Sequence, residues 1–362
     1  MTGCVDQRNW KFRQGLNGYR LISHKENKML KNSNKNFRIF TYLISCFLLI
    51  PFFPCLSGCS DATAPTAEQD PQAARVQRLL DQKWGMFICW SFATFIDEEW
   101  PRGIKDLSVF NPSGMDTDQW ARVAKDAGMG YILFLTKHHP GFCLWDTKTT
   151  DWKVTKSPLG KDVLAAVKKS CDKYGLKLAL YFSEGDETQP DSKNAELKKA
   201  QLKELCTQYG PIEFFWMDHA ASDGGLDHVE TAAWVKKFQP NCFVGFNHGQ
   251  VAGDMRLGEM GRPGVLDDLE ASGPYNEGVS EQYLIGEFAY PILVLDDGPR
   301  WFYSNPGNDN ICYSANKIYQ DYLGAVKYGN IFSLDVGPDC SGRLRPIDVK
   351  TLQQVGQMIK KP

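Results

Sequence analysis

The stretch YILFL, residues 131–135, runs directly into TKHHPGFCLW, residues 136–145, and this combination decides the fold class. Five consecutive apolar residues without alternation are typical of a strand that is buried on both faces, as in a parallel sheet. A lysine and two histidines, Lys137, His138 and His139, then stand where the buried run ends. Polar groups are costly beside a core unless they have partners. We therefore expect the end of this strand to face a ligand.

Similar apolar runs recur along the chain, at residues 85–92, 176–182, 212–216, 242–246 and 331–336. Amphipathic segments that predict helices separate most of them, at residues 118–127, 161–174, 195–209, 229–238, 315–328 and 347–360. Four of these segments are followed by a glycine suited to a helix C-terminus, namely Gly128, Gly175, Gly210 and Gly329. Buried strands alternating with helices indicate α/β architecture, either an open doubly wound sheet or a closed (β/α)8 barrel of the TIM type. Residues 250–286 break the pattern and predict a long loop beside the ligand.

The charge of the chain argues against one class of partner. Its 41 lysines and arginines nearly balance 43 aspartates and glutamates, which gives a formal net charge of −2. Binding of nucleic acid needs concentrated positive charge, and the body of the chain has no basic cluster. The seven cysteines after residue 59 are scattered without a CxxC pair, so we expect mostly buried free thiols and no zinc site. A small-molecule ligand is favoured.

Residues 1–59 are expected to be an N-terminal extension and a lipoprotein signal segment. Basic residues precede the apolar run 39–54, and the stretch LSGC, residues 56–59, offers small residues before a cysteine. This resembles a bacterial lipoprotein signal, in which Cys59 would carry the lipid and anchor the protein to a membrane in the periplasm or at the cell surface. A transmembrane anchor is the alternative, although Pro51 and Pro54 interrupt a run already short for spanning. Residues 60–74 predict a linker, and residues 75–362 a single barrel domain.

Polar residues mark the ends of the other expected strands as well. They are Cys89, Glu184, Asp186, Asp218, His219, Asn247, His248 and Asp335. Asp218 follows FFWM, which would bury its carboxylate unless it faces a cavity. An aspartate that caps the next turn explains this position equally well when Asp218 is taken alone. Set beside the other strand ends, catalysis is favoured.

Tryptophans near the strand ends support a sugar ligand, because an aromatic face packs well on the apolar face of a pyranose. They are Trp90, Trp100, Trp145, Trp216 and Trp301, of which Trp145 lies in the most polar surroundings. A metal hydrolase is a rival interpretation, with ligands drawn from His138, His139, Asp218 and His248. Adjacent histidines on a strand point to opposite faces, however, and no HxH or HExxH spacing occurs. We expect no metal, and the absence of a Gly-rich phosphate loop or a GxSxG elbow predicts no cofactor and no serine nucleophile.

Several motifs resemble, in order, those of the family-29 glycoside hydrolases, the α-L-fucosidases. They are WGMFI at 84–88, EW at 99–100, FNP at 110–112, the 136–145 stretch, FWMD at 215–218 and VGP at 336–338. The resemblance implies an irregular (β/α) barrel, a fucosylated glycan as partner, and a retaining double displacement at terminal α-L-fucose. It also implies a nucleophile at Asp218 and a sugar pocket that includes His138, His139, Trp145, Glu99 and Trp100.

A retaining mechanism needs a second carboxyl group about 5–5.5 Å from the nucleophile. Glu287, in IGEF ahead of RWFY at 300–303, resembles the segment that carries this acid/base in the family, and Glu259, in LGEM, is the runner-up.

The chain departs from the family pattern at three points. Cys89 stands where the family usually has a histidine, Asp335 stands where it usually has an asparagine, and no C-terminal β-sandwich is expected. A thiol is a poor hydrogen-bond donor. A glycosidase for a related sugar such as α-L-galactose, or a non-catalytic sugar-binding barrel, therefore remains an alternative.

Overall fold

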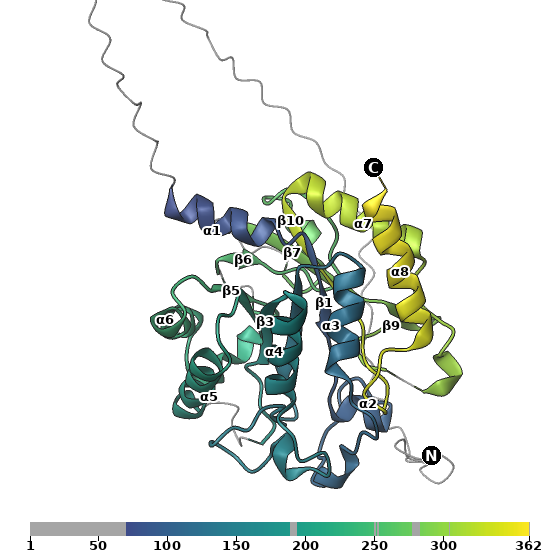
Figure 1. The fold of residues 1–362 in the computed structure, drawn as a ribbon. Helices are drawn as coiled ribbons and strands as arrows, with labels where there is room; N and C mark the ends of the chain where they lie inside the picture. Colours follow the sequence, from purple (N-terminus) through teal and green to yellow (C-terminus); the bar gives the residue numbers. More distant parts are fainter. Residues whose placement is uncertain are drawn as a thin grey trace, which may run out of the picture. The chain divides into compact units, whose positions relative to one another are not determined.

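The computed structural model describes residues 70–188, 194–249, 251, 253–276, 283–303 and 305–361. Eight parallel strands close into a barrel (Figure 1). Around the barrel they follow the order β1 (Trp84–Ile88), β10 (Asn330–Asp335), β7 (Ile285–Pro291), β6 (Met255–Arg256), β5 (Phe243–Phe246), β4 (Phe214–Asp218), β3 (Lys177–Ser183) and β2 (Tyr131–Lys137). The predicted (β/α)8-like barrel is confirmed, and the open doubly wound sheet is excluded.

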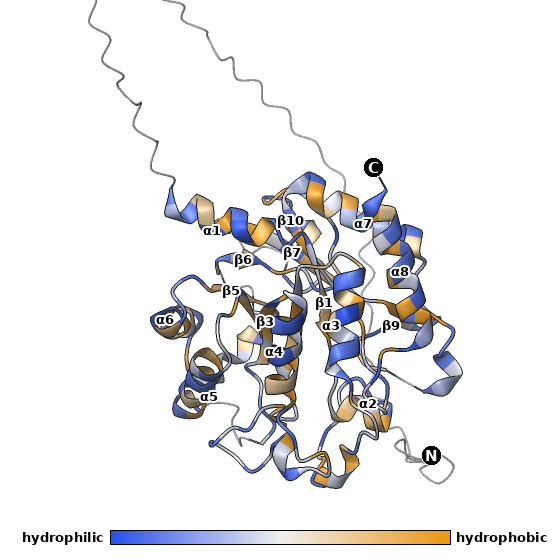
Figure 2. Cartoon of the chain, viewed as in Figure 1, coloured by the Kyte–Doolittle hydropathy of each residue, from blue (hydrophilic) through white to orange (hydrophobic). Residues whose placement is uncertain are grey.

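The expected helices are present with boundaries shifted by two residues or fewer. They are α3 (Thr117–Asp126), α4 (Val163–Tyr174), α5 (Ala195–Gln208), α6 (His228–Phe238), α7 (Ala315–Tyr328) and α8 (Pro346–Lys360). Five of them have an N-cap residue whose side chain accepts a hydrogen bond from a backbone N–H of the first turn. These N-cap residues are Asp116, Asp162, Asn194, Asp227 and Ser314. Hydrophilic and hydrophobic residues alternate along these helices, as amphipathic packing on a barrel requires (Figure 2).

The barrel is irregular between β5 and β7. β6 has two residues, the described part of the β5–β6 connection contains no helix, and a 3-10 turn at Leu269–Ser272 precedes β7. A hairpin of β8 (Leu293–Leu295) and β9 (Gly298–Arg300) follows β7. The predicted loop 250–286 is therefore wrong where it includes β6 and the start of β7, because a two-residue strand leaves no periodic signal.

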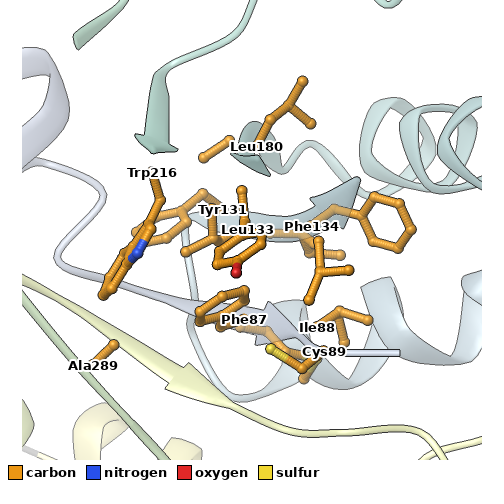
Figure 3. Packing of buried hydrophobic residues seen from close by; sticks show 14 of the residues in the cluster. Phe87, Ile88, Cys89, Tyr131, Leu133, Phe134, Leu180, Trp216 and Ala289 are labelled. Carbon is orange, nitrogen blue, oxygen red and sulfur yellow. The ribbon is translucent and has the colours of Figure 1, made fainter. Parts of the chain in front are cut away.

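Large side chains fill the inside of the barrel (Figure 3). The Phe87 ring lies 5.8 Å from the Tyr181 ring and 5.7 Å from the Trp216 ring. Gly85 makes room for Tyr131, since a Cβ atom at this position would come within 2.3 Å of the Tyr131 ring. The barrel is thus a packed core and not a channel, and a ligand can enter only at a mouth.

Helix α1 (Pro71–Leu80) packs against the N-terminal mouth. The Arg75 guanidinium lies 4.3 Å from the centre of the Phe243 ring at the start of β5, and Arg78 pairs with Glu213 just before β4 at 3.2 Å. The helix begins at Pro71, so it includes the last four residues of the segment 60–74 that was predicted as linker. With this mouth covered, the C-terminal strand ends provide the binding face.

The membrane anchor remains a prediction, because Cys59 and the signal segment lie outside the described residues. Within the described ranges, no helix is long and apolar enough to cross a bilayer. In the described part of the chain, six cysteines are free thiols, and all of these but Cys312 are buried, as expected: Cys89, Cys143, Cys171, Cys206, Cys242 and Cys312.

Candidate active site

Asp218 is the last residue of β4 and lines a cavity of about 70 Å³ at the C-terminal mouth. Its Oδ2 accepts from the Tyr181 hydroxyl at 2.5 Å, and its Oδ1 accepts from the His219 backbone N–H at 2.9 Å. Burial raises the pKa of Asp218, but His139, His248, His219 and the Tyr181 hydroxyl outweigh it and lower the pKa to about 2. Asp218 is therefore an ionised, buried carboxylate with its oxygens held in place. The expected position of Asp218 at a ligand cavity is confirmed.

Glu259 supplies a second carboxylate to the same cavity. One of its oxygens lies within 4.8 Å of an oxygen of Asp218. Asn247, fully buried after β5, bridges the two groups: its Nδ2 donates to Asp218 Oδ1 and to Glu259 Oε2, each at 2.8 Å. Asn276 donates to Asn247 Oδ1 at 2.6 Å, which fixes the amide so that its two N–H groups face the carboxylates. The separation of the two carboxylates is thereby held by hydrogen bonds.

Four imidazoles stack along one wall of the cavity. Ring centres are 3.9 Å apart between His138 and His139, 4.0 Å between His139 and His219, and 5.1 Å between His219 and His248. The adjacent His138 and His139 both line the cavity, so the expectation that they point to opposite faces is wrong. The reason is that β2 ends at Lys137 and the histidines lie in the turn that follows, in which the Gly141 N–H donates to the His138 carbonyl at 2.9 Å.

His219 and His248 have left-handed backbones, with φ of 55° and 60°. Such strain in residues other than glycine is typical of functional sites, and here each residue directly follows a strand-end group of the cavity.

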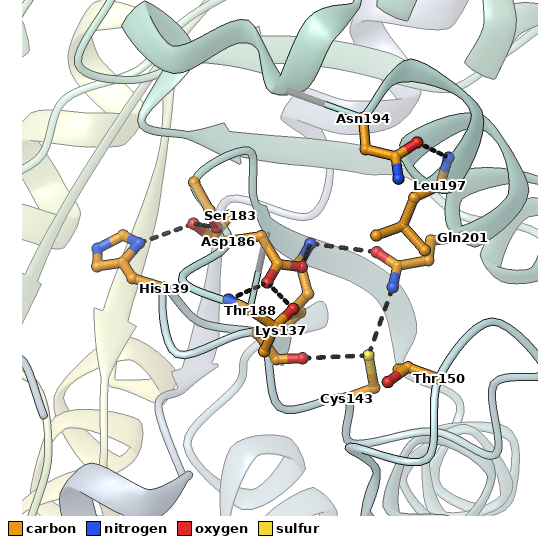
Figure 4. Close-up of polar contacts among 12 residues, drawn as sticks. Lys137, His139, Cys143, Thr150, Ser183, Asp186, Thr188, Asn194, Leu197 and Gln201 are labelled. Carbon is orange, nitrogen blue, oxygen red and sulfur yellow. Dashed lines mark hydrogen bonds and ion pairs between the residues drawn. The ribbon is translucent and has the colours of Figure 1, made fainter. Parts of the chain in front are cut away.

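The protonation of the histidines follows from their surroundings. Burial lowers the pKa of His138 well below its usual value and that of His139 to about 4, so both are neutral at pH 7. The His139 Nδ1 is 2.7 Å from the Ser183 hydroxyl (Figure 4). Burial also acts to lower the pKa of His248, but its 2.6 Å contact with Glu259 and the charge of Asp218 raise it overall. His248 Nε2 is thus held against the Glu259 carboxyl group by a short hydrogen bond.

Two buried polar atoms at this cavity have no hydrogen-bond partner among the described residues. They are the indole nitrogen of Trp216 and the Nδ1 of His138. An unpaired buried polar atom costs about 1–3 kcal/mol. Ligand hydroxyls would satisfy both groups, which suits a polyol better than an apolar ligand.

Glu99 and Cys89 complete the wall nearest β1. Glu99 accepts the backbone N–H groups of Trp301 and Phe302 at 3.0 and 3.3 Å, and burial raises its pKa to about 7 against these bonds. The Cys89 backbone N–H donates to Asp335 Oδ1 at 3.0 Å. Burial, and then the nearby Asp335 carboxyl, raise the pKa of the Cys89 thiol well above normal. This departure from the family pattern therefore places an un-ionised thiol in the cavity.

A buried ion pair supports the histidine segment from behind. Lys137 Nζ is 3.0 Å from Asp186 Oδ2 and 3.1 Å from Gln201 Oε1 (Figure 4). Glu184 likewise pairs with Lys198 at 2.9 Å. Buried carboxylates with such partners are structural, and they fix the β2 and β3 ends that carry His138 and Asp186.

Residues 59–362 match the family model described as α-L-fucosidase. The chain belongs to this family. It is 35% identical over 309 residues to the putative α-L-fucosidase 1 of Oryza sativa subsp. japonica, with 78% of this chain and 57% of that relative covered. It is 28% identical to α-L-fucosidase 1 of Arabidopsis thaliana, and that match covers 75% of this chain and 57% of the relative. The chain thus spans little more than half the length of these two relatives.

Solved structures of the family have the same barrel. The α-L-fucosidase isoenzyme 1 from Paenibacillus thiaminolyticus superposes with a TM-score of 0.66 at 25% identity, covering 80% of this chain and 76% of that one. A glycoside hydrolase 29 family member from an unknown rumen bacterium superposes with a TM-score of 0.63 at 28% identity. That match covers 78% of this chain and 56% of the other.

Glu287, predicted as the acid/base, does not line the cavity. It lies within β7 with no exposed surface, and Ser333 and the Gly258 N–H are its polar neighbours. The expectation that Glu287 faces the sugar is wrong: its side chain is enclosed in the barrel near Tyr131, Ser333 and Arg256. The runner-up, Glu259, lines the cavity: it lies three residues beyond the very short β6 and forms a β-bridge with Ala289 of β7.

Two of the five tryptophans that were expected to contact the sugar lie in the core instead. Trp90 and Trp145 have no exposed surface and do not line the cavity. The Trp90 indole donates to the Asp339 carbonyl and that of Trp145 to Glu204, so both rings are core residues with satisfied polar ends. Trp100, Trp216 and Trp301 do line the cavity, together with Glu99, His138 and His139.

Sequence reasoning did not single out Tyr181, Asn247 or Tyr275 as site residues. Tyr181 lies inside an apolar run, and Tyr275 lies in a loop whose path no pattern predicts. Asn247 gave a usable signal, since it stands at a strand end beside a histidine.

The described residues contain two groups able to approach one metal ion, both of which include Asp218. One adds His139 and His219, and the other adds His248 and Glu259. In each, Asp218 is already engaged by Tyr181 and Asn247. Both oxygens of Asp218 therefore already accept hydrogen bonds from protein groups.

Proposed function

We propose that this protein is a retaining glycoside hydrolase that removes terminal α-L-fucose from glycans. The observation that carries the proposal is the Asp218–Glu259 pair, with oxygens within 4.8 Å of each other in a cavity lined by histidines and tryptophans. This upper limit is close to the about 5–5.5 Å between the carboxyl groups of retaining enzymes and well below the about 6.5–9.5 Å of inverting ones. Membership of the α-L-fucosidase family supports fucose as the sugar.

In the first step, an oxygen of Asp218 attacks the anomeric carbon while the glycosidic C–O bond breaks. Glu259 gives its proton to the departing oxygen, which leaves as an alcohol, and a glycosyl ester with Asp218 remains. In the second step, Glu259 takes a proton from water, the water oxygen bonds to the anomeric carbon, and the Asp218 carboxylate is released. The low pKa of Asp218 keeps the nucleophile ionised, and the 2.6 Å contact between His248 Nε2 and Glu259 Oε2 holds the acid/base carboxyl group in place.

Azide products from two variants test the roles. With 4-nitrophenyl α-L-fucoside and azide, we expect Asp218→Ala to yield β-L-fucosyl azide and Glu259→Ala to yield α-L-fucosyl azide, because azide enters from opposite faces of the ring. Glu287→Gln is the matched control, since it alters a buried glutamate outside the cavity, and it should keep its activity. Azide rescue at Glu287→Ala in place of Glu259→Ala would overturn the assignment.

The same assay separates the alternatives for the unaltered protein. Faster release of nitrophenol from 4-nitrophenyl α-L-galactoside than from the fucoside would show that the preferred substrate is an α-L-galactoside. Binding of fucose by calorimetry without any release of nitrophenol would indicate a sugar-binding barrel.

We also propose that Cys59 carries a lipid that anchors the protein to a bacterial membrane, on the strength of the LSGC stretch after an apolar run. Expression of the full chain with radiolabelled palmitate tests this. Label and membrane fractionation should both be lost in Cys59→Ser, and persistence of either would contradict lipidation at Cys59.

A further inference from the structure

A second, wider cavity adjoins the sugar cavity at the barrel mouth. Its volume is about 460 Å³, within the range of small-molecule sites, whereas the inner cavity measures about 70 Å³. Five residues line both: Trp100, His139, His219, His248 and Tyr275. The inner and outer cavities therefore form one cleft, with the Asp218–Glu259 pair at its narrow end.

Two aromatic side chains stand at the boundary with unusual exposure. Trp100 is 65% exposed and Tyr275 is 44% exposed. The Tyr275 ring lies 4.3 Å from the His248 ring at an interplanar angle of 31°, so one face is supported. Aromatic rings that are held in place and open to solvent are suited to stacking on the apolar face of a sugar.

Each fixed charge that lines the outer cavity has an ion-pair partner. Arg102 lies 3.5 Å from Glu187, and Asp186 pairs with the buried Lys137 at 3.0 Å. A sulfated or carboxylated ligand would meet no surplus of positive charge here. The lining is therefore matched to a neutral saccharide.

Building on the proposed function, we propose that the outer cavity is a leaving-group site, which binds the neutral sugar to which fucose is attached by stacking it on Tyr275 and Trp100. The inner cavity has no room for a second sugar, so a departing saccharide passes through the outer one. Recognition of the glycan then rests on loop residues of the barrel, Trp100 after β1 and Tyr275 between β6 and β7.

Two substrates that differ only in the leaving group test this site. α-L-Fucosyl fluoride has a leaving group too small to reach Tyr275, whereas a neutral fucosylated trisaccharide fills the outer cavity. In Tyr275→Ala, we expect the ratio of kcat/KM for the trisaccharide to kcat/KM for the fluoride to fall about tenfold, as loss of one stacking contact predicts. Tyr328→Ala, at an exposed tyrosine on α7, is the control and should leave the ratio unchanged.

The ratio separates this proposal from indirect effects. Equal losses on both substrates would show that Tyr275 acts only through His248, and no loss on either would show that the leaving group binds elsewhere; both results overturn the proposal. An unaltered protein that turns over neither substrate would instead refute the proposed function, and the leaving-group site with it.

Discussion

Glu287 makes the stability of the protein depend on pH, and Glu287→Gln should remove that dependence. The carboxyl group is fully enclosed in β7. Burial raises its pKa from 4.5 to about 8, against a smaller lowering by Ser333 and the Gly258 N–H. The group is thus a neutral acid in the folded protein at pH 7, whereas it is an ionised carboxylate in the unfolded chain.

The size of the effect follows from linkage. At 1.36 kcal/mol per pKa unit, the gap between 4.5 and about 8 corresponds to about 5 kcal/mol of unfolding free energy. Because the folded protein holds the proton more tightly, this stability is fully present below pH 4.5 and is lost as the pH rises through 8. Glutamine has nearly the same shape and does not ionise. The variant should therefore gain stability relative to the unaltered protein as the pH rises.

Urea unfolding followed by tryptophan fluorescence at pH 5, 7 and 9 measures the difference. We expect the unfolding free energy of Glu287→Gln minus that of the unaltered protein to increase by several kcal/mol from pH 5 to pH 9. A difference that stays constant over this range would mean that Glu287 is solvated or ionised in the fold, and the reasoning would be refuted. Subtraction removes the contribution of every other titrating group.

Three further predictions concern the cavity. Asn247→Asp places a third carboxylate within hydrogen-bond reach of Asp218 and Glu259, so the acidic limb of the kcat/KM profile should move to higher pH by one unit or more; an unmoved limb would contradict the bridging role. Glu99, with a pKa of about 7, should bind sugar hydroxyls better when ionised, so KM should fall as the pH rises through 7. That inflection should vanish in Glu99→Gln, and its persistence would assign it to another group. The raised pKa of the Cys89 thiol keeps it un-ionised, so an hour with iodoacetamide at pH 8 should leave activity intact, and rapid inactivation that Cys89→Ser abolishes would show a reactive thiolate.

Much of the fold was predictable because its signals are local. An apolar run such as 131–135 must be buried wherever it lies, and a glycine after an amphipathic segment ends a helix in any context, as Gly175 and Gly329 do with φ of 65°. Strand β6 was missed because two residues carry no periodicity.

Asp218, His138 and His139 were found from sequence for a related reason. In a parallel barrel all C-terminal strand ends meet at one mouth, so polar residues at these ends gather there, and Asp218, His138 and His139 line the cavity. The resemblance to the family then gave these residues their expected roles.

Tertiary structure alone decided which glutamate and which tryptophans reach the ligand. Both faces of a barrel strand are apolar, so sequence cannot tell that Glu287 is enclosed in the barrel while Glu259, in a β-bridge beyond β6, lines the cavity. Trp145 has the more polar neighbours along the chain, yet it donates to Glu204 in the core, whereas Trp216, in an apolar run, faces the cavity without a hydrogen-bond partner among the described residues. The Asn247 bridge and the Tyr275 platform depend on contacts between segments distant in the sequence. Such contacts exist only once the barrel has closed.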